Sequence, residues 1–172
     1  MIHISDIIKL KSFKEKTNKK TQLEYYTENN ADPSILTLIE LNNKKFGEKI
    51  QKNVIDLFDL SKATDTSHDM TFKHFKIECK GCRFWTLLKD WKWQHITIEK
   101  EFDYIILVGV NFQGYNIFII SMKDVLKLID QNLITLQGKQ KGQGYWCEYK
   151  KIKDYLTELD TIDDFNYYMK NN

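Results

Sequence analysis

The sequence lacks an apolar run long enough to cross a membrane. Its longest apolar stretch, Tyr104 to Val110, is far shorter than the ~20 residues that a transmembrane helix requires. The first residues, Met1 to Ser5, do not form a basic segment followed by an apolar run, so no secretory signal peptide is expected. These absences predict a soluble, cytoplasmic protein with no membrane partner.

Cysteine and arginine are also scarce. The three cysteines, Cys79, Cys82 and Cys147, are an odd number and indicate a reducing, intracellular setting rather than a disulfide framework. Arg83 is the one arginine, and the net charge of the chain is only +2. A balance this close to neutral gives no sign of a polyanionic partner for the molecule as a whole. Any nucleic-acid surface must therefore be local.

What the sequence does contain is apolar material for a core. Of its 172 residues, 42% are hydrophobic and 13% aromatic, which is sufficient for one well-buried domain. No repeat or linker divides the chain. We therefore expect a single domain over 1–172, with a basic N-terminal segment (1–31), a central core (34–130), and a basic Gly/Gln/Lys loop followed by the C-terminal region (135–172).

Local patterns predict an α/β fold with a mixed central β-sheet flanked by helices. Asp32-Pro33 combines an N-cap with proline at the first helical position, and a long helical region is expected from there to about Leu60. Its core-facing stripe comprises Ile39, Phe46, Ile50, Val54 and Leu57. Further expected elements are a hairpin (68–72 and 75–81), a loop or helix (84–98), two strands (104–110 and 115–120), a helix (121–130) and a C-terminal helix with a frayed end.

The predicted hairpin brings acidic residues together. A turn at Lys73-His74 places Asp69 directly opposite Glu78, with their Cβ atoms ~4.5–5.5 Å apart. Because side chains alternate along a strand, Lys80 shares the face of Glu78, while Cys79 points towards the core. Opposed carboxylates destabilise a hairpin unless a cation lies between them. The pattern therefore predicts a Mg²⁺ ion held by Asp69, Glu78 and the carbonyl of Cys79.

A metal at this position suits phosphodiester hydrolysis. The ion would polarise the scissile phosphate and activate a bound water, and Lys80 would orient that water or stabilise the developing charge. A second interpretation stays open, because Asp69, Glu78 and Lys80 are also what a solvated hairpin face contains. The triplet Glu-x-Lys recurs at Glu148-Tyr149-Lys150, so the triplet by itself is a weak signal in this lysine-rich chain.

The run of Asp69 followed by Lys76-Ile77-Glu78-Cys79-Lys80, with Gln94-His95 and the buried strand 104–110 downstream, resembles the active-site core of the PD-(D/E)XK nuclease superfamily, particularly its type II restriction endonucleases. The resemblance covers roughly residues 46–130. It implies a restriction endonuclease-like fold, with a helix before the hairpin. It also implies metal binding by the two acids and a catalytic role for Lys80.

The resemblance also concerns residues around the hairpin. Gln94 is similar to a glutamine that supports the site in several branches of the family, although a surface amide beside Trp93 explains it equally well. Many members carry a helix acid near the metal, and the candidates for that place are Glu40, Glu48 and Gln51. The residue before Asp69 is a histidine where the family pattern has proline, which is a mild departure.

Contacts to DNA are expected mainly from the loop 137–145. Lys139 and Lys141 suit phosphates, Gln140 and Gln143 suit base edges, and Tyr145 closes the loop. A mobile surface loop without a ligand is the alternative. Arg83 is placed to hold a phosphate or a guanine, or else to make a structural ion pair.

Taken together, the residues and the resemblance predict a Mg²⁺-dependent type II restriction endonuclease that cuts double-stranded DNA as a homodimer. A repair, nicking or junction-resolving nuclease on the same fold is one alternative, and a non-catalytic DNA-binding module is another. Zinc is not expected at Cys79 and Cys82, because the chain has no second cysteine pair to complete such a site.

Overall fold

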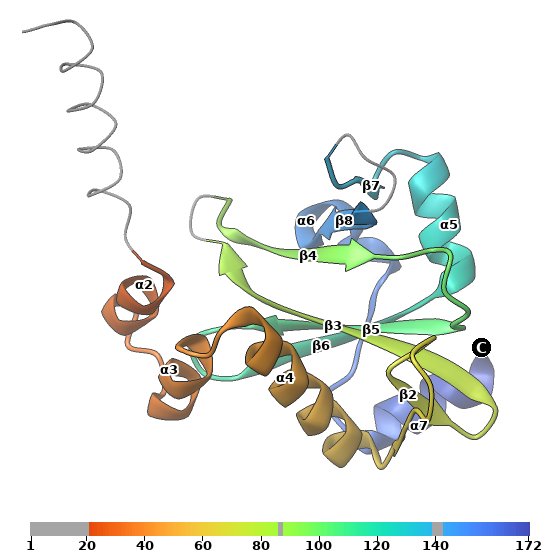
Figure 1. Cartoon of the computed structure of the whole chain (residues 1–172), viewed down its shortest axis with the longest axis horizontal. Helices are drawn as coiled ribbons and strands as arrows, with labels where there is room; N and C mark the ends of the chain where they lie inside the picture. Colours follow the sequence, from red (N-terminus) through yellow and green to blue (C-terminus); the bar gives the residue numbers. More distant parts are fainter. Residues whose placement is uncertain (1–20, 86–87, 139–142) are drawn as a thin grey trace, which may run out of the picture.

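The computed structural model describes residues 21–85, 88–138 and 143–172 (Figure 1). Its centre is a mixed sheet with the strand order β7-β8-β4-β3-β5-β6-β9, in which β3 and β5 are parallel and the other neighbours are antiparallel. The strands are β1 (Ser61–Lys62), β2 (Met70–Phe72), β3 (Phe75–Trp85), β4 (Asp90–Ile96), β5 (Tyr104–Val110), β6 (Tyr115–Ser121), β7 (Thr135–Leu136), β8 (Tyr145–Glu148) and β9 (Thr157–Glu158). The α/β class with a mixed central sheet is confirmed.

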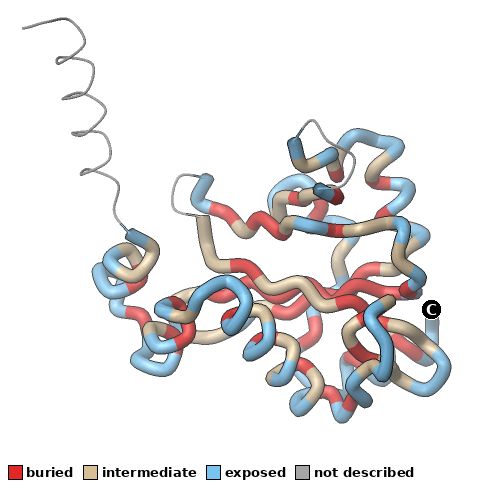
Figure 2. The backbone as a smooth tube through the Cα atoms, viewed as in Figure 1, coloured by how far each residue is buried: buried red, intermediate tan, exposed pale blue. Residues whose placement is uncertain are grey.

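Helices cover both faces of this sheet (Figure 1). They are α2 (Gln22–Glu28), α3 (Pro33–Ile39), α4 (Asn43–Phe58), α5 (Met122–Asp130), α6 (Tyr149–Ile152), a 3-10 turn η2 (Lys153–Tyr155) and α7 (Ile162–Asn171). One core lies under α3, α4 and α7, where Phe58 stacks on Phe165. A second core lies under α5 and α6 and centres on Trp93 and Phe118. Buried residues accordingly follow the central strands, while the outer helix faces are exposed (Figure 2).

The helical region before the hairpin is two helices rather than one long helix. Asp32 caps α3 as predicted, and its side chain accepts a hydrogen bond from the Ser34 N–H. Helix α3 ends at Ile39, and a new helix, α4, starts after Asn42, whose side chain accepts a hydrogen bond from the Lys45 N–H. Leu57 was expected in the core but is 45% exposed, and Phe58 is buried in its place.

The region 84–98 contains a strand, so the expectation of a loop or helix there was wrong. Strand β3 continues to Trp85, where it pairs with Asp90 at the start of β4. The indole N–H groups of Trp91 and Trp93 donate to the carbonyls of Val110 and Val108 in β5. These contacts link segments distant in sequence, which is why local patterns did not indicate the strand.

The predicted basic N-terminal segment is described only in part, whereas the predicted C-terminal helix is described in full. Residues 1–20 of the predicted basic N-terminal segment lie outside the described residues, and residues 22–28 form α2. At the C-terminus, a capping box of Thr161 and Asp164 starts α7, and the helix continues to Asn171 with Phe165 fully buried. The predicted C-terminal helix is confirmed. No helix in the described ranges has the length and apolar character needed to cross a membrane.

Candidate active site

The hairpin has the register that the sequence predicts. Met70 pairs with Ile77 and Phe72 with Phe75, so the turn is at Lys73-His74, and Lys73 takes a left-handed conformation with φ 56°. Asp69 precedes the first paired residue of β2, and the expected direct pair of Asp69 with Glu78 is not part of the observed ladder. The Asp69 N–H donates at 3.1 Å to the carbonyl of Ile77, the residue that already pairs with Met70, so the regular ladder ends at Met70.

Strand β3 has an unpaired edge next to the hairpin. On one side, residues 77–83 pair with β5 throughout. On the other side, β2 pairs only as far as Ile77, and β4 pairs only from Phe84. In the part of the chain that the structure describes, no strand covers the edge between them. Strand β4 diverges from β3 at this point, which opens the sheet (Figure 1).

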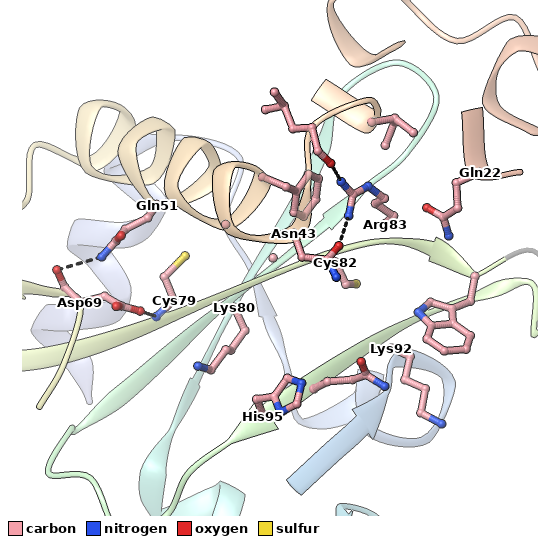
Figure 3. A pocket seen from close by; sticks show the side chains of 17 residues that line it. Gln22, Asn43, Gln51, Asp69, Cys79, Lys80, Cys82, Arg83, Lys92 and His95 are labelled. Carbon is pink, nitrogen blue, oxygen red and sulfur yellow. Dashed lines mark hydrogen bonds between the residues drawn. The ribbon is translucent and has the colours of Figure 1, made fainter. Parts of the chain in front are cut away.

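Asp69 uses this unpaired edge. One of its carboxylate oxygens, Oδ2, accepts a hydrogen bond of 2.8 Å from the Cys79 N–H (Figure 3). In an extended strand the N–H and C=O of one residue face the same edge. The Cys79 carbonyl therefore faces the side on which Asp69 lies.

A cleft of about 720 Å³ lies along the same edge, between α4, β3 and β4. Figure 3 shows Asp69 and Gln51 at one end of it and Gln22 and Lys92 at the other. The cleft thus brings together five of the predicted site residues. Its lining includes the predicted residues Asp69, Cys79, Lys80, Arg83 and Gln94.

Glu78 is not among the residues that line the cleft, and it is only 1% exposed. Its Oε1 accepts a hydrogen bond of 2.7 Å from Lys80 Nζ and lies 3.6 Å from Lys100 Nζ. Its other oxygen, Oε2, is buried without a hydrogen-bond partner among the described residues. A bare buried carboxylate oxygen is costly unless a donor or cation satisfies it. Lys100 was not predicted, because its loop position carries no signal in a sequence so rich in lysine.

The environment of Asp69 indicates that the two acids act on each other. Burial raises the pKa of Asp69, and the negative charge of Glu78 raises it further. The Cys79 N–H and the charges of Lys80 and Lys100 oppose this shift. Two coupled carboxylates, one with an unsatisfied oxygen, fit a hard divalent cation such as Mg²⁺.

The ligand set at this position is small. Across residues 21–85, 88–138 and 143–172, no group of three or more His, Cys, Asp or Glu side chains is placed to hold a metal ion. An ion between Asp69 and Glu78 would complete its shell with the Cys79 carbonyl, water and a phosphate oxygen. That mixture is usual for Mg²⁺, which keeps several waters.

Replacing Asp69 with asparagine is expected to stabilise the metal-free protein at pH 7. The raised pKa means that the folded state holds the Asp69 proton more tightly than the unfolded state, so stability falls as pH rises from 3.8 through the raised pKa. Asparagine does not ionise, so this loss of stability is absent, and its amide oxygen still accepts from the Cys79 N–H. The free energy of unfolding should therefore rise by up to about 1 kcal/mol. Urea denaturation in a chelating buffer at pH 7 and pH 4 measures the difference in unfolding free energy between Asp69→Asn and the wild type. This difference should be smaller at pH 4. A less stable variant at pH 7 would contradict this account of Asp69.

Of the three helix candidates, the structure brings one to the site. The Nε2 of Gln51 donates to the main-chain carbonyl of Asp69 at 3.2 Å, and the side chain lines the cleft. Glu40 is exposed at the end of α3, and Glu48 is exposed and 4.0 Å from Lys44. Gln51 therefore holds the backbone of Asp69 in place.

Arg83 is engaged in packing within the chain. Its guanidinium lies 4.0 Å from the centre of the Phe46 ring and donates to Asn43 Oδ1 and to the Leu41 carbonyl. These contacts join β3 to the start of α4. None of these contacts is an ion pair, and they occupy the guanidinium within the chain. Besides the two predicted roles, a contact to phosphate or guanine and a structural ion pair, Arg83 therefore has a packing role.

Residues near both ends of the segment 137–145 contact β4 at the edge of the cleft. His95 has φ 58° at an irregularity in the pairing of β4 with β8. Its N–H donates to Gln137 Oε1 at 3.0 Å, and its Nδ1 lies 3.3 Å from the Gln143 carbonyl. Gln143 is exposed, and Tyr145 pairs with Ile96 in the sheet. The predicted contact residues Lys139, Gln140 and Lys141 lie outside the described residues.

The three cysteines are free. Burial is the main cause that raises the pKa of each thiol, in Cys79, Cys82 and Cys147 alike. A thiol that resists deprotonation is a poor metal ligand and a poor nucleophile.

No protein-family model matches the chain, and a search of curated proteins finds no match either. Only the geometry of the site therefore indicates a function.

Proposed function

We propose that the protein is a Mg²⁺-dependent endonuclease that hydrolyses phosphodiester bonds of DNA. The observation that carries this proposal is the position of Asp69 beside Glu78-Cys79-Lys80, on an unpaired strand edge that borders a cleft. Two coupled carboxylates with a lysine on the same face provide what this hydrolysis needs: a cation site and a positive charge next to it.

Each residue has a defined part in this proposal. Asp69, the Oε2 of Glu78 and the carbonyl of Cys79 would hold the ion, which supplies Lewis-acid polarisation of the phosphate and a more acidic water. Lys80, whose Nζ is 2.7 Å from Glu78 Oε1, orients the attacking water and stabilises the charge that develops on the phosphate. Gln51 and the Cys79 N–H keep Asp69 in position.

The substrate that we propose is double-stranded DNA, cut at a short specific sequence as by a type II restriction endonuclease. Gln137 and Gln143, towards the two ends of the segment 137–145, contact His95 beside the cleft, and a segment anchored there suits contact with a bound duplex. Its lysines suit phosphates, and its glutamines suit adenine edges. A homodimer would present two such sites to the two strands.

Plasmid and phage DNA incubated with the protein in Mg²⁺ test this proposal. Discrete fragments are expected from the wild type and none from Asp69→Ala or Lys80→Ala. Lys76→Ala is the matched control, because Lys76 lies on the same strand but pairs with Glu101 at 3.2 Å. It should cleave like the wild type. Thermal melting of each variant establishes that it is folded.

Three results would separate the alternatives. Nicked circles alone, or cleavage confined to branched DNA, would indicate a nicking or junction-resolving nuclease on the same site. DNA binding without metal-dependent cleavage would indicate a non-catalytic module. Full cleavage by Asp69→Ala would remove the site assignment altogether.

A further inference from the structure

We propose that Lys100 supplies a fixed second positive charge at the metal site, so that one divalent ion is sufficient for the reaction. This inference rests on the proposed function. It adds a reaction-related role for a residue that neither the hairpin pattern nor the family resemblance indicates.

The geometry sets Lys100 apart from the other surface lysines. It lies in the connection between β4 and β5, and its Nζ is 3.6 Å from Glu78 Oε1, the same oxygen that Lys80 contacts at 2.7 Å. Two ammonium groups thus share one oxygen of Glu78, while Oε2 has no partner in the described part of the chain. The charge of Lys100 also acts on Asp69, where it helps to lower the pKa.

The charges of these four side chains cancel. Asp69 and Glu78 contribute two negative charges when ionised, and Lys80 and Lys100 contribute two positive charges. One divalent ion then adds two positive charges, which a phosphodiester and an attacking hydroxide would offset. A second divalent ion would leave an excess of positive charge at short range in a partly buried site, which is costly.

Nucleases with two ions use one on the attacking side and the other on the leaving side of the phosphate. Here Lys100 is a cation that the fold already holds next to the carboxylates. While no ion is bound, it also competes for Glu78. Lys100 should therefore weaken metal binding and, at the same time, accelerate cleavage. A residue with only a structural role would not produce these opposite effects.

The test compares Lys100→Met with wild type and with Lys76→Met. Lys76 is the matched control, since its side chain is 39% exposed against 38% for Lys100, and it pairs with Glu101 instead of Glu78. Calorimetry of the metal-free full chain with Mn²⁺ is expected to show about tenfold tighter binding by Lys100→Met alone. Cleavage at saturating Mg²⁺ is expected to be slower by roughly 100-fold for this variant.

A charge-preserving variant, Lys100→Arg, should keep affinity and rate close to the wild-type values. Unchanged or weaker Mn²⁺ binding by Lys100→Met would overturn the inference while leaving the proposed function in place. Tighter binding with an unchanged cleavage rate would overturn it as well. A wild type that neither binds Mn²⁺ nor cleaves DNA would overturn the proposed function, and this inference with it.

Discussion

Glu78→Gln is expected to lower the rate of Mg²⁺-dependent DNA cleavage by on the order of 10³-fold or more. This loss equals or exceeds the largest losses usual when one group that stabilises developing charge is removed. Glutamine has nearly the shape of glutamate, and the position is only 1% exposed, so the packing around it is retained. What is lost is the negative charge, and with it the anionic ligand provided by Oε2. Single-turnover cleavage of plasmid DNA measures the loss, and calorimetry with Mn²⁺ measures the accompanying loss of metal binding.

The matched control for this variant is Glu148→Gln. Glu148 belongs to the second Glu-x-Lys triplet of the chain and also pairs with lysines, at 3.7 Å from Lys92 and 3.4 Å from Lys151. It has no opposed aspartate on a hairpin and should retain nearly full activity. Equal loss of activity in the two variants would mean that general charge effects, and not the site at Asp69, explain the result.

Trp93→Ala is expected to lower the free energy of unfolding by about 3–5 kcal/mol, the usual cost of deleting a large buried aromatic side chain. Trp93 is fully buried and donates its indole N–H to the Val108 carbonyl at 3.0 Å. The change leaves a cavity in the core under α5 and α6 and removes the indole hydrogen bond to the Val108 carbonyl. Because β4 forms one wall of the cleft, cleavage activity should fall together with stability.

Urea denaturation measures this effect, and Tyr167→Ala is the comparison. Tyr167 is 73% exposed on α7, and its replacement should change the unfolding free energy by no more than about 0.5 kcal/mol. A Trp93→Ala variant as stable as wild type would mean that β4 is not packed on β5 as described.

The part of the site that lies within the hairpin could be predicted because its geometry is local. A short turn at Lys73-His74 determines the register from Phe72 to Met70, and Asp69 then follows directly and reaches the Cys79 N–H. The helix starts at Asp32 and Ser121 were predictable for the same reason, since each cap bonds to a backbone N–H only two or three residues further on.

Residues that reach the site from elsewhere could not be predicted in this way. Gln51 was one of three candidates on the preceding helical region, and only the packing of α4 against β3 selects it. Lys100 approaches Glu78 from a loop with no regular pattern. Arg83 had two expected roles, and its stacking on Phe46 depends on where α4 begins.

By itself, the sequence determined the hairpin turn and the helix caps at Asp32 and Ser121, because hydrogen bonds and side-chain alternation between near neighbours decide them. The tertiary structure alone decided the divergence of β4 from β3, the unpaired edge, the cleft beside it and the approach of Lys100 to Glu78. These features arise from contacts between distant segments, such as Trp93 with Val108, whose free energy depends on the packed core.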